Sequence, residues 1–392
     1  MKLLKRTWAD ISLDNLEHNY RTLREHVGKG PRFLGVVKAD AYGHGAVQVS
    51  RTLQALGAEY LAVSNLEEAV QLRNGGVELP VLILGYTPPE YAPDEAELHI
   101  TQEVHGLQYA KDLNKALEGT GRRLTVHLKI DTGMTRLGFF ADQPEATLAA
   151  LVEVSKLPNL YIEGVFMHFC VSDSKKPEDI AFTKLQHKRF VDMLDMMKAK
   201  GIEPKIRHCC NSGATILHPE YAMDMIRPGV ATYGFHPSPD TVGEIDLRPM
   251  MSLHTSIAQI RTIAAGKSIS YGRTYTTPED KLVAVLPIGY ADGLSRLLSN
   301  RVSFRICGKE ARVLGRICMD MCMVDISDIP EAKVGTTATL FGYDEDGTLL
   351  PCERIADMLG TINYEIVCDV NKRVPRIYYK DGKQVGVLQY IV

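Results

Sequence analysis

Short apolar runs and helical patterns alternate through the first part of the chain, and this alternation restricts its fold more than any other feature. Eight runs have the length and composition of buried strands, and helical patterns lie between most of them. Eight strands with intervening helices in about 230 residues are typical of a (β/α)8 barrel. The expected strands are Phe33–Val37, Tyr60–Val63, Val81–Leu84, Leu98–Thr101, Leu124–Ile130, Tyr161–His168, Lys205–Cys209 and Met225–Arg227.

The helical patterns agree with this fold. Ser12 or Asp14 can cap a first helix, because apolar residues from Leu16 to Val27 keep to one face. Helical spacing of apolar residues predicts further helices over Ala46–Leu56, Leu66–Leu72, Leu107–Leu117, Ala146–Val154 and Ala181–Lys200.

The pattern changes after Tyr233, where the proline-containing stretch His236–Asp240 indicates a linker. We therefore expect an α/β barrel domain over residues 1–240 and a smaller, mainly β domain over residues 241–392, with which Met1–Asp10 can pack. The second domain has one clear helical pattern, near Ile355–Leu359. Its expected strands are Ser256–Ile263, Leu282–Pro287, Val302–Cys307, Arg312–Cys318 and Ala338–Tyr343.

Composition excludes several classes of function. The 392 residues include 45 Lys and Arg against 48 Asp and Glu, a net charge of −3, so we expect no nucleic-acid or membrane partner. No run approaches the ~18 apolar residues of a membrane span, and the N-terminus lacks the apolar core of a signal peptide. We expect a cytoplasmic protein. The 8 cysteines lack the spacing of a zinc site, and we expect no metal.

Lys38 is the first candidate for chemistry. It comes directly after an apolar strand and before a loop with Gly43 and Gly45, which leads into a helix. A lysine at the end of a buried strand can lose solvation, which lowers its pKa and makes its amine a nucleophile towards an aldehyde. A lone lysine in such a place more often ends a strand in solvent, so the argument depends on its neighbours.

Those neighbours follow other strands of the expected barrel. Polar residues end or directly follow the fifth, sixth, seventh and eighth strands, where barrel enzymes carry their active sites: Asp131–Arg136, His168, Asn211–Gly213 and Arg227. Ser212 and the backbone amides of Gly229 and Val230 lie in the loops after strands seven and eight, which commonly bind phosphate. An aldehyde cofactor that carries a phosphate fits both the lysine and this cradle. The sequence therefore indicates pyridoxal 5'-phosphate.

Several separated motifs, which together span almost the whole chain, resemble the alanine racemase family, fold type III of the pyridoxal phosphate enzymes. The motifs are Val37–Gly45, Lys129–Gly138, Asn211–Ser212, Arg227–Gly234, Ser270–Arg273, Gly289–Gly293, Arg316–Asp320 and Thr361–Glu365. The resemblance implies a homodimer with shared active sites. It also implies that Lys38 holds the cofactor and is one catalytic base, while Tyr271 of the partner subunit's second domain is the other.

The same resemblance implies the remaining roles. Arg227 would face the pyridine nitrogen, with His168 bridging Arg227 and Tyr271. Arg136 and the Met319 amide of the partner would bind the substrate carboxylate. Lys129 is either carbamylated, and then pairs with Arg136, or a plain salt-bridging lysine. The other residues implied to hold the cofactor, mainly through its phosphate, are Tyr42, Asn211, Ser212, Gly229, Val230 and Tyr364.

These residues suit racemisation. Removal of the Cα proton from one face and its return on the other needs two opposed groups, and a lysine and a tyrosine can each act as acid or base. A guanidinium can donate a hydrogen bond to a pyridine nitrogen but cannot protonate it. Arg227 would therefore make the ring a weaker electron sink and favour reprotonation at Cα over transamination.

The expected function is interconversion of L-alanine and D-alanine, which supplies D-alanine for bacterial peptidoglycan. A broad-specificity or serine racemase shares nearly all of the motifs and stays open. A decarboxylase of basic amino acids has a similar architecture but does not need the opposed Tyr271. A non-catalytic, single-domain cofactor-binding barrel would lack everything after Tyr233.

Overall fold

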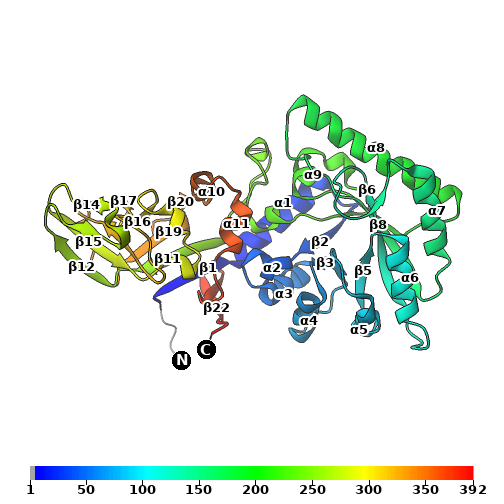
Figure 1. Cartoon of the computed structure of the whole chain (residues 1–392), viewed down its shortest axis with the longest axis horizontal. Coiled ribbons are helices and arrows are strands. Elements are labelled where there is room, and N and C mark those ends of the chain that lie inside the picture. The colour runs from blue at the N-terminus through cyan, green and yellow to red at the C-terminus, as the bar shows by residue number, and fades with distance from the viewer. Residues whose placement is uncertain (1–4, 392) are drawn as a thin grey trace. The chain divides into compact units, whose positions relative to one another are not determined.

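The computed structural model describes residues 5–391, which form two compact units (Figure 1). The barrel unit contains Glu17–Ala41 and Ala46–Arg248. The β unit contains the residues up to Leu16, the short segment Tyr42–Gly45 and all residues from Pro249 onward. The expected packing of Met1–Asp10 with the second domain can be followed only from residue 5, since residues 1–4 lie outside the described part. Within that part, no helix combines the length and apolarity needed to cross a membrane.

The barrel unit is built on eight strands: β2 (Arg32–Val36), β3 (Tyr60–Val63), β4 (Val81–Ile83), β5 (Ile100–Val104), β6 (Leu124–Asp131), β8 (Leu160–Phe166), β9 (Ile206–His208) and β10 (Met225–Ile226). Successive strands pair in parallel, and β10 pairs with β2. Between β9 and β10, backbone hydrogen bonds run from Asp224 N to Arg207 O (3.0 Å) and from Arg227 N to Cys210 O (2.9 Å). The predicted (β/α)8 barrel is confirmed. A two-residue strand, β7 (Phe139–Phe140), pairs with β6.

The predicted fourth strand, Leu98–Thr101, lies a little too early. Strand β5 runs on through Gln102 and Glu103, both of which are fully buried. Polar residues normally end an apolar strand pattern, but here Gln102 donates to the carbonyl oxygen atoms of Gly85 and Glu103, each at 2.8 Å. The barrel interior therefore holds polar side chains that the apolar pattern does not reveal.

Helices follow the strands of the barrel unit (Figure 1). The pattern over Ala46–Leu56 predicts α3 to the residue, and the predicted first helix is capped by Ser12, whose Oγ accepts the amide of Asn15 at 3.1 Å. The α-helices associated with the barrel sequence are α1 (Leu13–Val27), α2 (Lys38–Tyr42), α3 (Ala46–Leu56), α4 (Leu66–Asn74), α5 (Ala92–Glu97), α6 (Leu107–Ala116), α7 (Pro144–Ser155), α8 (Pro177–Ala199) and α9 (Ser212–Leu217). Short 3-10 helices are η1 (Pro89–Tyr91), η2 (Pro219–Tyr221), η3 (Val230–Tyr233) and η4 (Pro239–Thr241).

The β unit is mainly β-sheet, as predicted. Its largest sheet has the order β17-β16-β19-β11-β1-β21-β22, with β20 beside β19, and two smaller sheets have the orders β12-β15-β18 and β13-β14. The strands are β1 (Thr7–Ser12), β11 (Met251–Ser256), β12 (Gln259–Ile263), β13 (Ser268–Ile269), β14 (Tyr275–Thr276), β15 (Lys281–Leu286), β16 (Ser303–Ile306), β17 (Lys309–Arg312), β18 (Cys322–Asp325), β19 (Thr337–Tyr343), β20 (Leu349–Leu350), β21 (Arg376–Lys380) and β22 (Lys383–Leu388). The helices are α10 (Glu353–Leu359), α11 (Asn363–Cys368), η5 (Tyr271–Arg273), η6 (Tyr290–Asp292) and η7 (Arg296–Leu298).

Two predicted strands of this unit are wrong in detail. The predicted strand Ser256–Ile263 is interrupted, because Ile257 donates to Thr336 and Ala258 donates to Val285, so the chain passes from one sheet to another. The predicted strand Arg312–Cys318 does not form. Its Gly315 has a φ of +77° and lies so near Ile269 O that a Cβ there would come within 2.5 Å. Helix α11 was not predicted, since its six residues are too few for a clear helical pattern.

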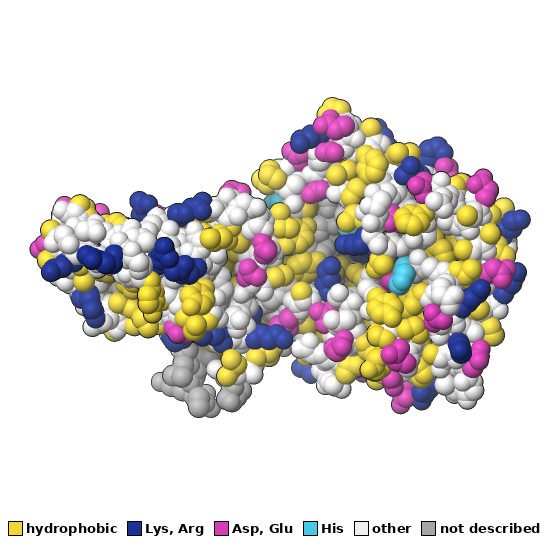
Figure 2. Space-filling model, viewed as in Figure 1, with side chains coloured by type: hydrophobic (Ala, Val, Ile, Leu, Met, Phe, Trp, Pro, Cys, Tyr) yellow, Lys and Arg dark blue, Asp and Glu magenta, His cyan; other side chains and the backbone are white. Residues whose placement is uncertain are grey.

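The visible surface carries charges of both signs. Figure 2 shows basic and acidic side chains interspersed over this face of each unit. This distribution agrees with the small net charge of −3.

Candidate active site

The C-terminal ends of the barrel strands carry the predicted polar residues. Lys38 follows β2, His168 follows β8, Ser212 follows β9 and Arg227 follows β10. Because these strands are parallel, their C-terminal ends meet at one mouth of the barrel. The fold therefore brings together residues that are far apart in the sequence.

Lys38 opens the short turn α2, whose backbone is left-handed. Ala39 and Asp40 have φ values of 51° and 54°, a conformation that costs a non-glycine residue about 1–2 kcal/mol. The amide of Ala39 donates to Glu68 Oε1 at 2.7 Å, and Asp40 Oδ1 accepts the first amide of α3 at 2.9 Å. Such strain persists only where the surroundings enforce it, so we infer that this turn fixes the direction in which Lys38 leaves β2.

Arg227 is buried, with 3% of its surface exposed. Its Nη1 donates to His208 Nδ1 at 2.9 Å, and its Nη2 donates to the carbonyl oxygen atoms of Met167 (2.8 Å) and Cys209 (3.2 Å). These bonds use Nη1 and Nη2 and leave Nε as a donor for a ligand. Burial lowers the pKa of Arg227 to about 10, which still keeps the guanidinium charged at neutral pH.

The imidazole hydrogen-bonded to Arg227 is that of His208, and the predicted bridge through His168 stays a prediction. Within residues 5–391, no hydrogen bond joins Arg227 and His168. Burial, together with the positive charges of Arg227 and Arg136, holds the pKa of His168 well below its ordinary value, so this imidazole is neutral. The sequence analysis did not name His208, because the predicted strand Lys205–Cys209 continues past it, whereas His208 is the last residue of β9.

Ser212 connects the loops that follow β9 and β10. Its Oγ accepts the amides of Gly229 (2.8 Å) and Ala231 (3.3 Å), and Ser212 is almost fully buried. Asn211 caps α9, because its Oδ1 accepts the amide of Ala214 at 3.0 Å. Val230 is the first residue of η3. These contacts hold a hydroxyl and the start of two short helices close together, as the predicted phosphate cradle requires.

Lys129 and Arg136 belong to β6 and to the loop after it. Lys129 is buried, with its Nζ 5.6 Å from the centroid of the Phe166 ring. Burial is the main cause that lowers the pKa of Lys129 to about 8, and the charge of Arg136 contributes. Asp131 organises the loop, because its carboxylate accepts the amides of Gly133 (2.9 Å) and Arg136 (3.0 Å). The loop leaves Arg136 exposed.

The β unit contains the other predicted residues. The rings of Tyr42 and Tyr364 lie 6.0 Å apart, and burial raises the pKa of Tyr42 above its ordinary value, so its phenol keeps its proton. Tyr271 and Met319 are 67% and 52% exposed. The β unit therefore leaves the Tyr271 phenol and the Met319 side chain uncovered.

The sequence prediction missed a polar chain inside the barrel. His127 Nδ1 lies 2.8 Å from His208 Nε2, and His127 Nε2 lies 3.3 Å from Glu163 Oε2. One pattern could have indicated it. In the apolar run of β6, His127, Lys129 and Asp131 occupy every second position, which places them on one face of the strand.

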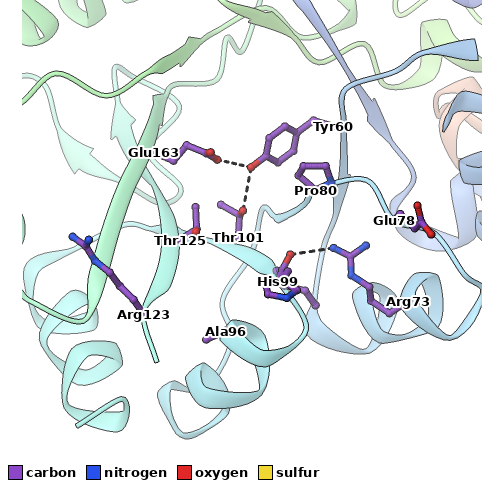
Figure 3. A pocket seen from close by; sticks show the side chains of 11 residues that line it. Tyr60, Arg73, Glu78, Pro80, Ala96, His99, Thr101, Arg123, Thr125 and Glu163 are labelled. Atoms are coloured by element: carbon purple, nitrogen blue, oxygen red, sulfur yellow. Dashed lines mark hydrogen bonds between the residues drawn. The ribbon is translucent and has the colours of Figure 1, made fainter. Parts of the chain in front are cut away.

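A cavity of about 240 Å³ opens at the opposite end of the barrel (Figure 3). It is lined by Tyr60, Thr101 and Thr125, which lie at the starts of strands, and by Glu163. None of the predicted site residues lines it. Arg73 lies in the wall of this cavity and donates to four backbone carbonyl groups, so its guanidinium stabilises the surrounding loops.

Comparison with known proteins gives matches over both units. The family profile described as alanine racemase, N-terminal domain, matches residues 11–237, and the profile described as alanine racemase, C-terminal domain, matches residues 250–378. An alanine racemase of Clostridium tetani is 41% identical over 392 residues, with all of both chains covered. An alanine racemase of Desulforamulus reducens is 44% identical over 95% of this chain and 98% of its own.

Solved structures agree. An alanine racemase of Clostridium difficile 630 superposes with a TM-score of 0.95 at 39% identity and full coverage of both chains. The alanine racemase of Bacillus anthracis with bound L-Ala-P gives a TM-score of 0.91 at 33% identity, over 100% of this chain and 99% of that one.

Proposed function

This chain belongs to the alanine racemase family and is an enzyme that interconverts L-alanine and D-alanine with pyridoxal 5'-phosphate, and we propose that Lys38 and Tyr271 move the proton. The full-length match to relatives of that name supports the reaction and does not favour a basic amino-acid decarboxylase. The residues at the C-terminal ends of the barrel strands support the catalytic and binding roles proposed for them.

The loops after β9 and β10 have donors that suit the phosphate of the cofactor. Ser212 Oγ and the backbone amide of Val230 suit a phosphate, with Tyr42, Asn211, Gly229 and Tyr364 as the further residues proposed to hold the cofactor. Lys38, directed by the left-handed turn, would hold the cofactor's aldehyde carbon. When bound, the cofactor supplies a ring that withdraws electrons from the substrate Cα.

Arg227 would face the ring nitrogen through its Nε. A guanidinium donates a hydrogen bond without giving up its proton, because its pKa of about 10 remains well above neutral. The ring then withdraws fewer electrons than a protonated ring would. This supports proton return to Cα over transamination.

Lys38 and Tyr271 would act on opposite faces of Cα. One amine and one phenol suffice, because whichever group removes the proton leaves the other to return one. Tyr271 is 67% exposed on its own chain, which supports the proposal that it completes the active site of a second copy in a homodimer. His168, neutral through burial, can accept or donate a hydrogen bond near Lys38 and Arg227.

The substrate carboxylate would bind Arg136 and the Met319 amide of the partner. Lys129, with a pKa of about 8, is neutral in about a tenth of the molecules at pH 7, and the neutral amine is the form that reacts with CO2. We therefore propose that Lys129 is carbamylated and that the resulting negative charge orients Arg136.

Conversion of L-alanine tests this function. The purified enzyme with pyridoxal phosphate should convert L-alanine to an equal mixture of both enantiomers, and L-serine much more slowly. Release of CO2 from lysine or arginine, with no racemisation of alanine, would contradict it.

We also propose that the enzyme is cytoplasmic, where it would make D-alanine for peptidoglycan. Cell fractionation followed by detection of the enzyme tests this location.

A further inference from the structure

A continuous chain of hydrogen bonds leads from Arg227 through the barrel interior. Arg227 Nη1 lies 2.9 Å from His208 Nδ1, His208 Nε2 lies 2.8 Å from His127 Nδ1, and His127 Nε2 lies 3.3 Å from Glu163 Oε2. Both imidazoles are fully buried. The chain thus joins the proposed cofactor site to a carboxylate near the other end of the barrel.

The direction of every bond in this chain is determined. A guanidinium only donates, so His208 Nδ1 must accept and the ring proton of His208 lies on Nε2. His208 Nε2 then donates to His127 Nδ1, which leaves the proton of His127 on Nε2, where it can donate to Glu163. Burial lowers the pKa of both histidines, which keeps both rings neutral and in one tautomer each.

The packing around the two imidazole rings restricts their orientation. The ring of Phe166 stacks on His208 with 4.9 Å between centroids and 8° between planes. Gly164 leaves room for His127, because a Cβ at that position would come within 2.5 Å of the imidazole. The ladder between β6 and β8 is irregular between Val126 and His127. The rings are thus held in fixed orientations.

Glu163 ends the chain beside the cavity of Figure 3. Its Oε2 also accepts from Tyr60 OH at 2.5 Å, and Tyr60 OH lies 3.1 Å from Thr101 Oγ1. Its side chain is 25% exposed. The hydrogen bond to His127 is the main cause that lowers the pKa of Glu163, and burial opposes it. Glu163 is therefore ionised and can only accept.

We propose that Glu163 is a positioning residue for Arg227, acting through His127 and His208 to keep an unprotonated imidazole nitrogen towards the guanidinium. The benefit to catalysis rests on the proposed place of Arg227 at the ring nitrogen. Arg227 and Glu163 favour the same tautomers from the two ends of the chain. Without an acceptor at position 163, the Nε2–H of His127 is buried with no acceptor, and only the contact with Arg227 still favours these tautomers. A fraction of the molecules then adopts the reversed tautomers, in which a protonated His208 Nδ1 faces the guanidinium.

Nitrogen NMR of holoenzyme with isotope-labelled histidine reads these tautomers directly. His127→Asn and His208→Asn assign the signals. In the unchanged enzyme both rings should be neutral, with the proton on Nε2. Glu163→Leu should give His127 a second population with its proton on Nδ1, whereas Glu163→Gln should preserve the single tautomer, because the Gln carbonyl can still accept. Unchanged tautomers in Glu163→Leu would overturn the proposal, and so would a doubly protonated His208 in the unchanged enzyme.

Tyr60→Phe is the matched control. It removes a donor to the same carboxylate oxygen but keeps the acceptor for His127, so the tautomers should stay as they are. The turnover number should fall about tenfold in Glu163→Leu, the effect of one buried hydrogen bond, and less than about twofold in Tyr60→Phe, with KM little changed in both. Equal losses in both variants would overturn the positioning role.

The NMR result also separates this proposal from the proposed function. If the unchanged enzyme fails to racemise alanine while Glu163→Leu still alters the tautomer of His127, the function is wrong and the chain of contacts holds. If alanine is racemised and Glu163→Leu leaves both tautomers unaltered, only the role of Glu163 is wrong.

Discussion

In the proposed active site, Arg227 is the side chain that would favour one reaction over another. Its three hydrogen bonds fix the guanidinium, and its pKa of about 10 keeps it a donor that does not release its proton. A carboxylic acid in the same place could share its proton with the ring nitrogen. In the proposed site, the balance between racemisation and transamination would therefore depend on this one residue.

Replacement of Arg227 by Glu should slow racemisation at least tenfold and increase side transamination, because the ring would become a stronger electron sink. Loss of optical rotation measures the first rate, and accumulation of pyruvate from alanine measures the second. Arg227→Met loses the same hydrogen bonds but brings no acid, so it should lose racemisation without gaining transamination. With cofactor occupancy intact, unchanged rates in Arg227→Glu would contradict this account.

The lowered pKa of Lys129 gives a prediction about how the stability of the fold depends on pH. Its pKa of about 8 in the folded chain lies below the ordinary 10.5, so the folded state binds fewer protons than the unfolded state between these values. An unmodified Lys129 would therefore cost about 3 kcal/mol of stability below pH 8, and stability would recover as the pH rises from about 8 to 10.5. Carbamylation removes the buried positive charge and with it this dependence.

With isotope-labelled CO2, carbon NMR should detect a carbamate that grows from pH 7 to about pH 9 at constant dissolved CO2, since the neutral amine is the reactive form. Lys129→Arg cannot form a stable carbamate and provides the control for other lysines. A spectrum identical to that of Lys129→Arg at every pH would show that the lysine stays unmodified.

Among the secondary-structure elements, the left-handed turn α2 is the most unusual. Ala39 is exposed, so removal of its methyl group would lose no packing. Its φ of 51° gives the Cβ a steric cost that glycine would not have. The turn holds strain next to the proposed cofactor-binding residue Lys38. We expect that release of this strain stabilises the fold and does not help catalysis.

Ala39→Gly should raise the free energy of unfolding by about 0.5–1 kcal/mol, because glycine adopts positive φ without a steric cost. Ala149→Gly, at an exposed position within α7, should lower it by about 1 kcal/mol. Urea denaturation followed by circular dichroism measures both. The turnover number of Ala39→Gly should be equal to or lower than that of the unchanged enzyme. A loss of stability in this variant would contradict the proposal that the turn is strained.

At the scale of the whole molecule, the two units carry different parts of the proposed chemistry. Lys38 belongs to the barrel unit, and Tyr271 belongs to the β unit, where it is mostly exposed. A homodimer in which each β unit completes the partner's active site would use both. This arrangement predicts complementation between inactive variants.

Lys38→Ala and Tyr271→Phe homodimers should each lose most racemase activity. When equal amounts are dissociated and reassociated, about half of the dimers are mixed, and each mixed dimer has one intact site, so roughly a quarter of the original activity should return. Recovery is measured after mass spectrometry shows that heterodimers have formed. Absence of recovery would mean that each subunit completes its own site.

The sequence by itself determined the barrel, the mainly β unit and the positions of the polar residues after the strands. Apolar periodicity decides which segments are buried strands, and parallel strands necessarily bring residues such as Lys38 and Arg227 to one end. The course of β5 through Gln102 and Glu103, and the break at Gly315, could not be predicted, because their hydrogen bonds and close contacts come from distant segments.

Only the tertiary structure decided which side chain meets which. His208 lies beside Arg227 because adjacent strands of a closed barrel place their inward residues together, whatever their separation along the chain. His127 on β6 meets His208 on β9 across β8, because alternate strands of a barrel place inward side chains in one interior layer, and Gly164 on β8 provides the space. Glu163, also on β8, then lies beside His127. A sequence pattern records which residues are polar and buried, but a hydrogen bond depends on distances of 2.8–3.3 Å that only the folded barrel sets.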